Sequence, residues 1–289
     1  MAAWMGRRNP KLLMSIRYFV RFHKPLHLRH PRNLNEKILH LSLMTDTTRW
    51  TELADKYRVR KYIEDCGYKD NLPKLYGVWD NACDIDFDAL PKSFVMKTNH
   101  GCGDVRIVHD KALINKTELI AYFNQQLKTP YGEVEAGLHY MRIKPCIIAE
   151  ELLITPIQLQ KYSKSLIDYK MWCFNGHCQY IWACCNRDKH GAEVLFYDKE
   201  WICHPEFSIF TEHYRQGNII PKPLNLNQMI AMAETLSKPF PCVRVDLYNI
   251  DGKIYFGEMT FTSLGGMMNF FTDEFLNKAG DMIDLNYRG

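Results

Sequence analysis

Residues 244–266 read RVDLYNIDGKIYFGEMTFTSLGG. The β-branched and aromatic residues on either side of Asp251-Gly252 predict two strands, at 242–249 and 253–260, joined by a two-residue hairpin turn. Residues two apart in a strand point to the same face, so Arg244 and Asp246 share a face. The register set by the turn allows Asp246 and Glu258 to meet across the ladder.

Two carboxylates that face each other among apolar neighbours repel unless a cation lies between them. Oxygen ligands of this kind suit Mg²⁺, which takes a few carboxylates and leaves its other positions to water and phosphate. The alternatives are two solvated carboxylates at an exposed hairpin, or two acids each paired with a basic residue. The hydroxyls and glycines at 262–266 favour a site, because small residues let backbone N–H groups approach an anion closely.

A second candidate site is the segment FVMKTNHGCGD at 94–104. A predicted strand at 93–98 delivers Lys97, and a turn containing Gly101 and Gly103 follows it directly. One ammonium group and several backbone donors are thereby placed where they could cover phosphates. The segment is not a Walker A loop, because the lysine precedes the glycines, and it is not a GxGxxG fingerprint. The alternative is an ordinary hairpin turn, with Cys102 a passive loop cysteine.

Charged residues also interrupt apolar segments elsewhere. In IIAEELL at 147–153, backbone groups could pair with an adenine edge, and a carboxylate could accept a hydrogen bond from its amine or from a ribose hydroxyl. Asp168 and Lys170 share a face at the start of the next predicted strand. Lys56, on a predicted helix, supplies a further cation. The alternative for the acids is that they are simply solvated on an ordinary strand. The alternative for Lys56 is that it lies on a solvated helix face.

The elements expected along the chain define the fold class. Helices are expected at 35–66, ending at Gly67, at 117–127 with Thr117 or its neighbour as the cap, and at 226–237. Strands are expected at 75–79, 93–98, 105–109 and 146–154, followed by a hairpin of 166–175 and 178–184 that turns at Asn175-Gly176. This order of antiparallel hairpins and helices predicts an α+β protein rather than a regular βαβ series.

The composition excludes several classes of protein. In 289 residues, 46% are hydrophobic and 24% charged, which is typical of a globular chain. No apolar stretch approaches the ~18–20 residues of a membrane span, and no apolar block of a secretory signal is visible. The ten cysteines form no CxxC pair, so we expect reduced thiols in a soluble cytoplasmic protein. No nucleic-acid-binding module is recognisable, and no nucleic acid partner is expected.

The net charge of +4 is unevenly distributed. Up to Lys37 the chain has nine Lys and Arg residues against one acid, Glu36, a net charge of +8, so the remainder carries −4. Apolar residues alternate with these cations, which predicts an amphipathic helix. Such a helix could lie on an anionic membrane face or hold a polyanionic substrate. The alternative is a helix that packs on the body of the protein through its apolar side, with its charges solvated.

Taken together, these segments resemble the ATP-grasp superfamily, and more closely its TupA-like branch, which is associated with cell-surface polysaccharide and teichuronopeptide synthesis. The matching stretches are ADKYRVRKYIEDCG at 54–67, LPKSFVMKTNHGCGDVRIV at 90–108, YMRIKPCIIAEELL at 140–153, DYKMWCFNG at 168–176, FYDKEW at 196–201 and 244–266. The resemblance implies two α+β lobes that sandwich ATP. We expect a basic helical segment at 1–70, a small lobe with the glycine-rich flap at 71–155, and a catalytic lobe with the metal-binding hairpin at 156–289.

The resemblance also implies a role for each candidate residue. Nucleotide phosphates would be bound by Lys56 and Lys97, with His100, Gly101 and Gly103 in the flap that closes over them. The adenine side would be formed by Glu150, Glu151, Leu152 and Leu153, and Asp168 with Lys170 would face the ribose or adenine. Mg²⁺ would be held by Asp246, Glu258 and Thr260, although many ATP-grasp enzymes have an asparagine at the position of Thr260. Arg244 and Lys97 would steady the charge on the transferred phosphoryl group.

The implied activity is that of an ATP- and Mg²⁺-dependent carboxylate–amine ligase. Its substrate would be an acidic small molecule or glycan that is a cell-surface polysaccharide or its precursor. This substrate could be free or lipid-linked. The basic N-terminus would suit peripheral contact with the inner membrane face. Two other enzymes remain open, a sugar kinase on the same scaffold and a glycosyltransferase, because Asp84-Ile85-Asp86 has the form of a metal-binding Asp-x-Asp. A third alternative is a scaffold without catalysis.

Overall fold

The computed structural model describes residues 2–289, and Met1, the first residue of the expected N-terminal segment, lies outside the described residues. The helices are α1 (Ala2–Arg8), α2 (Pro10–Phe22), α3 (Leu34–Met44), α4 (Thr48–Leu53), α5 (Val59–Asp65), α6 (Lys116–Lys128), α7 (Leu138–Met141), α8 (Leu226–Ser237) and α9 (Asp273–Asp281). The strands are β1 (Leu75–Trp79), β2 (Phe94–Thr98), β3 (Arg106–Val108), β4 (Ile147–Glu150), β5 (Asp168–Phe174), β6 (His177–Asp188), β7 (Gly191–Asp198), β8 (Tyr214–Gln216), β9 (Cys242–Ile250) and β10 (Lys253–Thr260). No helix within residues 2–289 has the length and apolar character needed to cross a membrane.

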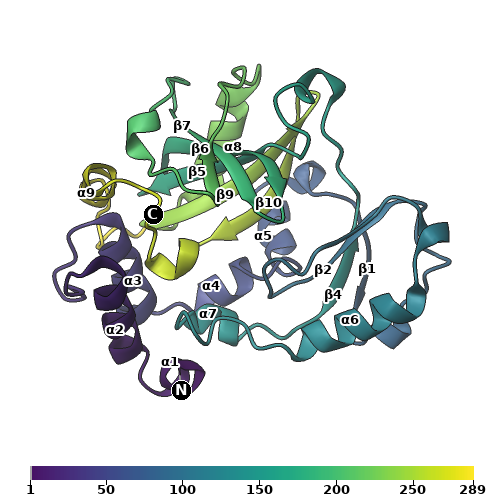
Figure 1. Ribbon diagram of the computed structural model, residues 1–289, viewed down its shortest axis with the longest axis horizontal. Coiled ribbons are helices and arrows are strands. Elements are labelled where there is room, and N and C mark those ends of the chain that lie inside the picture. Colours follow the sequence, from purple (N-terminus) through teal and green to yellow (C-terminus); the bar gives the residue numbers. More distant parts are fainter. Residues whose placement is uncertain (1) are drawn as a thin grey trace.

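The strands form two sheets in separate lobes, with the N-terminal helices at the lower left of Figure 1. The smaller sheet has the order β1-β4-β2-β3, and the larger has the order β10-β9-β5-β6-β7-β8. All neighbouring strands are antiparallel except β7 and β8. The expected α+β class is therefore confirmed.

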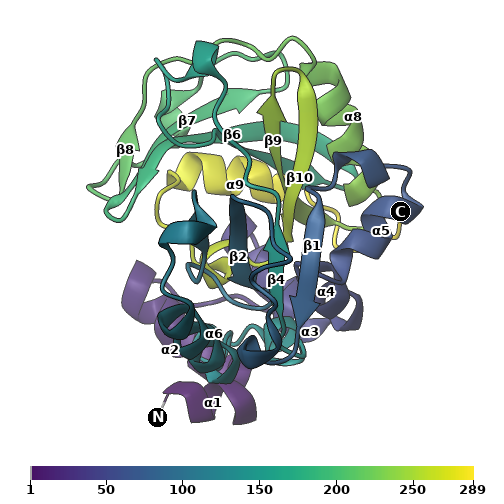
Figure 2. The same ribbon diagram turned by 90° about the vertical axis from the view of Figure 1, so that its right-hand side faces the viewer.

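The smaller sheet buries one face against α6, which Figure 2 shows below β2 and β4. On β2 the residues Phe94 and Met96 are completely buried in this core with Phe123 of α6. Because side chains alternate along a strand, Lys97 is directed to the opposite face of the sheet. The burial of two apolar side chains thus determines which way the lysine points.

The larger sheet is organised by two hairpins with the expected turns. Asn175 and Gly176 have φ angles of 48° and 76°, and Asp251 and Gly252 have φ angles of 50° and 84°. Positive φ at both central residues matches the right-handed twist of the flanking strands, and Asn-Gly and Asp-Gly adopt it at low cost. Helix α8 packs on this sheet through Met229, Met232, Ala233 and Leu236, all fully buried.

The N-terminal helices join the larger lobe through a small apolar cluster. Met14 and Tyr18 of α2 pack with Leu39 of α3 and with Met267, which follows the short helix η6 (Ser263–Gly266). Gly266 has φ of 72°, and a Cβ there would lie 2.9 Å from Leu39 Cγ. A glycine is therefore required where the turn after β10 approaches α3.

Three expected local features differ in the structure. The strand expected at 146–154 ends at Glu150, because β4 pairs with β1 and β2 only through 147–150 and the chain then crosses to the larger sheet. The expected helical run 35–66 is broken, so Lys56 lies between α4 and α5 rather than on a helix. Asp55 accepts hydrogen bonds from the backbone N–H groups of Tyr57 and Arg58 (2.9 and 3.1 Å), which forms a turn at 55–58 before α5 begins at Val59.

Helix α6 also begins earlier than expected. Its N-cap is Asn115, whose side-chain oxygen accepts from Glu118 N, and Thr117 lies inside the first turn. Asparagine is a stronger N-cap than threonine because its short amide reaches the free N–H groups of the first turn, so it determines where the helix starts.

Candidate functional site

The candidate site begins at the hairpin of β9 and β10. Asp246 and Glu258 are direct cross-strand partners, as expected, and Gly257 forms an irregularity in the ladder just before this pair. A Cβ on Gly257 would lie 3.0 Å from the backbone oxygen of Asp246, so the residue must be small. The irregularity places the side chains of Asp246 and Glu258 at the same level of the sheet.

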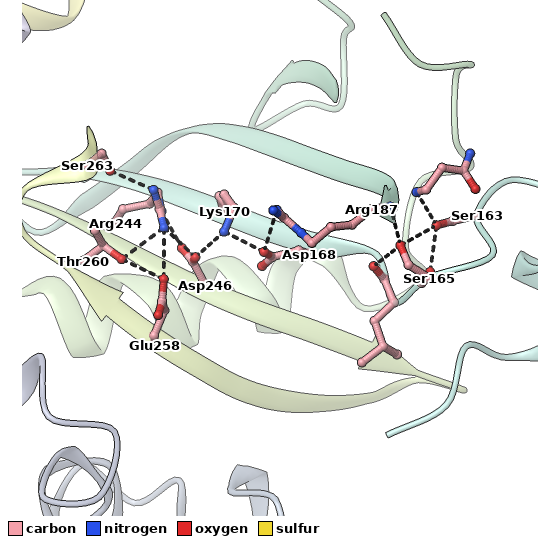
Figure 3. A network of polar contacts seen from close by, with 12 residues as sticks. Ser163, Ser165, Asp168, Lys170, Arg187, Arg244, Asp246, Glu258, Thr260 and Ser263 are labelled. Atoms are coloured by element: carbon pink, nitrogen blue, oxygen red, sulfur yellow. Dashed lines mark hydrogen bonds and ion pairs between the residues drawn. The ribbon is translucent and has the colours of Figure 1, made fainter. Parts of the chain in front are cut away.

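Arg244 connects the polar side chains of this hairpin (Figure 3). Its Nε and Nη2 atoms donate to the two oxygens of Asp246 at 2.6 and 2.7 Å. Nη2 also donates to Glu258 Oε1 at 3.2 Å and to Thr260 Oγ1 at 3.0 Å. Nη1 donates to Ser263 Oγ at 2.7 Å. The N–H groups of this buried guanidinium thus donate hydrogen bonds to one carboxylate on each strand, Asp246 on β9 and Glu258 on β10.

Lys170 of β5 extends the network on its other side. Its Nζ atom lies 2.5 Å from Asp246 Oδ2 and 2.6 Å from Asp168 Oδ2, and Figure 3 shows the three side chains in a row. The pairing follows from the sheet order, because β5 lies beside β9 with Lys170 opposite Asp246. Two cations and three carboxylates therefore alternate along the neighbouring strands β5, β9 and β10.

The two aspartates of this row differ in their pKa values. Burial acts to raise the pKa of Asp246, but Arg244 and then Lys170 outweigh it and hold the pKa at about 2. Burial raises the pKa of Asp168, and Lys170 offsets that shift only in part. Asp168 Oδ1 is buried and has no hydrogen-bond partner within residues 2–289. The row therefore ends in a carboxylate that is incompletely satisfied.

The donor set fits a small divalent cation. Asp246, Glu258 and Thr260 offer only oxygen atoms, and Glu258 keeps 42% of its side chain exposed, so one ligand faces solvent. No cluster of three or more His, Cys, Asp or Glu side chains suited to a metal occurs in the described part of the chain. Mg²⁺ needs few protein ligands and completes its coordination with phosphate and water, so the oxygen atoms of this hairpin would be enough to hold it. A bound cation would share these carboxylates with Arg244 and Lys170.

In the smaller lobe, Lys97 is paired with an acid. Lys97 Nζ of β2 lies 2.7 Å from Glu150 Oε2 of the neighbouring strand β4. The other oxygen of Glu150 accepts from Arg60 of α5 at 2.9 Å. Arg60 was not identified by the sequence analysis, and it reaches this point only because α5 packs beside the end of β4. Lys97 and Glu150, assigned to phosphate and adenine contacts, thus lie side by side.

The loop after β2 is held in place by Asp55, Lys56 and Asn99. Lys56 Nζ donates to the backbone oxygen of Gly101 at 2.5 Å, and Lys56 N donates to the backbone oxygen of Asn99 at 3.1 Å. Asn99 Nδ2 donates to Asp55 Oδ2 at 2.8 Å. Lys56 is therefore next to the glycine-containing loop, 45 residues away in the sequence.

Other loop residues have separate environments. His100 is buried, and its Nε2 lies 3.2 Å from the backbone oxygen of Thr129. Asp104 accepts from Thr98 N at 2.7 Å, and a Cβ on Gly101 would lie 3.2 Å from its Oδ1. Gly103 has φ of 82° with open space around its Cα. The loop tip is thus formed by residues that tolerate a left-handed backbone and close approach.

The segment expected at the adenine side follows β4. Glu151 N donates to Lys74 O at 2.9 Å, which ties the segment to the start of β1. Leu152 and Leu153 are half-buried and have no regular secondary structure. This segment leads from the smaller sheet to the larger, so it lies between the two lobes, as an adenine-contacting connection requires.

Two tyrosines that the sequence analysis did not identify also approach the hairpin. The rings of Tyr131 and Tyr140 are in edge-to-face contact with centroids 5.0 Å apart. Burial raises the pKa of Tyr140 well above its usual value, and the charge of Glu258 raises it further. Burial raises the pKa of Tyr131, with contributions from Cys102 and Glu258. No sequence pattern indicated them, because their segment is brought to the site only by the packing of the lobes.

Most of the chain matches a known protein family. The sequence profile of the TupA-like ATP-grasp family matches residues 36–284, which is most of the chain. Two lobes built on antiparallel sheets, with carboxylates on a hairpin of one and a lysine on the other, are what the resemblance to ATP-grasp proteins led us to expect. The chain belongs to the TupA-like ATP-grasp family. The fold and the family expected from the motifs are thus confirmed.

Several solved structures are similar to parts of this chain. One is D-alanine–D-alanine ligase from Bacillus anthracis, with 17% identity, a TM-score of 0.47, and coverage of 87% of this chain and 69% of that chain. Another is L-amino acid ligase from Bacillus licheniformis, with 14% identity, a TM-score of 0.49, and coverage of 90% and 56% respectively. A third is N5-carboxyaminoimidazole ribonucleotide synthetase, with 14% identity, a TM-score of 0.45, and coverage of 74% and 46%. No curated protein matches the chain.

Proposed function

We propose that this protein is an ATP- and Mg²⁺-dependent ligase that joins a carboxylate to an amine. The observation that carries the proposal is the row of charges on β5, β9 and β10, in which Arg244 and Lys170 alternate with Asp168, Asp246 and Glu258. Membership of the TupA-like ATP-grasp family supports it. The buried cations Arg244 and Lys170 would stabilise the negative charge that develops during phosphoryl transfer.

Each part of the site has a role in this proposal. Asp246 and Glu258, with the hydroxyl of Thr260, would hold Mg²⁺, which would neutralise phosphate charge. Lys97 and Lys56 would bind the phosphates, and the loop with His100, Gly101 and Gly103 would cover them. Residues 150–153 would contact adenine, and Asp168 with Lys170 would face the nucleotide. The proposed lobe boundaries are 70/71 and 155/156.

The proposed reaction has two steps. The γ-phosphoryl group of ATP moves to a substrate carboxylate oxygen, which gives an acyl phosphate and ADP. The amine then attacks the acyl carbon, inorganic phosphate leaves, and an amide forms after the amine loses a proton. In both steps this chain orients the reactants, and Arg244 and Lys97 stabilise the charge on the transferred group. No covalent intermediate with a protein side chain is needed.

The proposed substrate is a precursor of a cell-surface polysaccharide that carries acidic groups and is either free or lipid-linked. The excess of nine cations over one acid up to Lys37 supports an acidic partner. The same charge supports peripheral contact with the inner face of a membrane.

The test is to detect the acyl phosphate by trapping. The protein is incubated with ATP, Mg²⁺, hydroxylamine and a panel of uronic acids and amino acids, and hydroxamate formation is measured. A ligase forms a hydroxamate with its own carboxylate, and Glu258→Gln abolishes the product while Asp251→Asn, at the tip of the same hairpin, retains it. A product heavier by one phosphate on a sugar hydroxyl identifies a kinase instead. Protection against heating by a UDP-sugar but not by ATP identifies a glycosyltransferase, and either result overturns the proposal.

A further inference from the structure

Helix α2 has apolar side chains on two opposite sides. Leu13, Met14 and Tyr18 are buried against the body of the protein. Leu12, Ile16, Phe19 and Val20 are exposed, by 48%, 47%, 57% and 68% respectively. A helix that only packs on a protein needs one apolar side, so its second apolar side requires another explanation.

The exposed residues form a continuous stripe. At about 100° per residue, positions 12, 16, 19 and 20 fall within an arc of roughly 100°. The buried positions 13, 14 and 18 lie on the remaining arc, toward α3. No residue among 2–289 covers the stripe, since all four side chains are exposed in the full chain. Trp4 of the preceding helix α1 is also 63% exposed.

Cations outnumber acids around this stripe, and of its lysines and arginines only Arg7, Arg17 and Lys24 form ion pairs, with Glu133, Glu135 and Asp273, among the described residues. The segment up to Lys37 has a net charge of +8, and no acid occurs before Glu36. Arg8, Lys11 and Arg29 are exposed and form no ion pair with a carboxylate in the described part of the chain. Glu36 itself is buried and held by His27 and the backbone of Arg32. The surface therefore combines uncompensated cations with exposed apolar side chains.

We infer that the surface formed by Trp4, Leu12, Ile16, Phe19 and Val20 docks onto an anionic lipid bilayer. An interfacial helix needs an apolar side to enter the acyl boundary and cations to meet the acidic headgroups, and this segment has both. Charge complementarity favours this partner over a second copy of the chain, because the unpaired cations of two such surfaces, among them Arg8, Lys11 and Arg29, would repel each other.

The docking surface is close to the candidate site. The buried side of α2 contacts Met267, which follows η6, and Ser263 at the start of η6 accepts from Arg244. Arg17 of α2 also donates to the backbone oxygen of Val134 at 2.8 Å. Docking itself does not require the ligase activity. If the proposed function is correct, docking through α2 would hold the enzyme at the membrane that contains a lipid-linked substrate, with α2 packed between the bilayer and the segment that follows the metal-binding hairpin.

The test is co-sedimentation of the full chain with extruded vesicles. We expect the protein to sediment with vesicles of phosphatidylglycerol and phosphatidylcholine, to bind pure phosphatidylcholine at least 10-fold more weakly, and to be released by 0.5 M salt. The variant Leu12→Ser/Ile16→Ser/Phe19→Ser should bind anionic vesicles at least 10-fold more weakly. The matched control is Leu113→Ser/Ile157→Ser/Leu224→Ser, three side chains that are more exposed and lie elsewhere, and it should bind as the wild type does.

Three results would overturn the inference. The first is that the wild type does not bind anionic vesicles. The second is that the stripe variant binds them as well as the wild type does. The third is that, without lipid, the wild type sediments as a dimer and the stripe variant as a monomer. All substituted side chains are exposed, so folding should be retained, and equal urea unfolding midpoints verify this. Hydroxamate formation with water-soluble substrates is measured in parallel. It depends on the hairpin, so it should be unchanged in the stripe variant. The two measurements together distinguish a failure of docking from a failure of the proposed function.

Discussion

Asp246 and Glu258 stand directly opposite each other on β9 and β10, and one nitrogen of Arg244, Nη2, donates to both carboxylates. The repulsion between the two acids is thus offset by a cation that the same hairpin provides. The guanidinium does not exclude a metal ion, because Glu258 remains partly exposed and can offer its other oxygen. Four predictions concern Glu258 and Lys170 of this network, the partly buried Lys97 and the buried His139.

Glu258→Gln should abolish most ATP-dependent activity and leave the fold intact. The side chain is 42% exposed, and an amide of the same size keeps the contact geometry while removing the negative charge. We expect turnover to fall about 10²–10³-fold, the range for loss of one charge contact in a transition state. ADP release is measured at saturating Mg²⁺. Asp251→Asn is the control, and normal turnover by Glu258→Gln would show that Glu258 is not a metal ligand.

Lys170→Met should destabilise the protein strongly. Lys170 is buried between Asp168 and Asp246, and its removal leaves Asp246 with Arg244 and leaves Asp168, among residues 2–289, with only the longer 3.7 Å contact to Arg187. Breaking a buried ion pair by removing one partner costs about 3–5 kcal/mol. The free energy of unfolding is measured in urea. Lys144→Met, which removes an exposed lysine paired with an exposed Asp80, should cost less than about 1 kcal/mol.

An equal, small loss in both lysine variants would mean that the buried row contributes little to stability. The double variant Asp168→Asn/Lys170→Met should recover part of the loss, because it removes an unpaired buried charge along with its partner.

Lys97→Met should weaken ATP binding more than it weakens folding. Lys97 is already paired with Glu150, so nucleotide phosphates must take over or share this ammonium group. We expect the Kd for ATP to rise about 10–100-fold, equal to about 1.4–2.7 kcal/mol of binding free energy, measured by calorimetry. Lys92→Met, just before the same strand, should leave the Kd unchanged. A normal Kd in Lys97→Met would remove this lysine from the nucleotide site.

His139 should make the protein less stable as the pH falls below 7. It is fully buried next to Trp50, neither ring nitrogen has a partner within residues 2–289, and burial lowers its pKa to about 3. The unfolded chain binds a proton here near pH 6.5 and the folded chain does not, so stability rises with pH between about 3 and 6.5. From pH 7 to pH 5 this residue should cost about 2 kcal/mol.

The measurement is urea unfolding at both pH values in the wild type and in His139→Phe. The variant should lose about 2 kcal/mol less than the wild type between pH 7 and pH 5, because phenylalanine does not titrate. His30→Gln, at an exposed position, should behave as the wild type does. An identical pH dependence in His139→Phe would mean that the imidazole binds a proton as readily in the folded chain as in the unfolded chain.

Much of the fold can be predicted from local sequence because local chemistry determines it. Asn175-Gly176 and Asp251-Gly252 are among the few residue pairs that adopt positive φ twice in succession at low cost, so they specify both hairpins before any tertiary contact forms. The apolar spacing of 226–237 matches α8 at both ends. The pairing of Asp246 with Glu258 needs more than the turn, because the irregularity at Gly257 shifts the register by one residue just before this pair.

Other features were decided by tertiary packing. The end of β4 at Glu150, the turn at Lys56 and the pairing of Lys97 with Glu150 depend on which strands and helices lie beside one another. Arg60, Tyr131 and Tyr140 reach the site from distant segments, without any local pattern that could have indicated them.

The sequence by itself determined the hairpins, the α+β class and the family, because turn residues and side-chain alternation act over a few neighbouring residues. Only the tertiary structure decided how charges are partnered, with Lys170 between two acids and one side of α2 left uncovered. The physical reason is that electrostatic pairing and burial depend on distances of a few ångströms between segments far apart in the chain, and local preferences do not contain those distances.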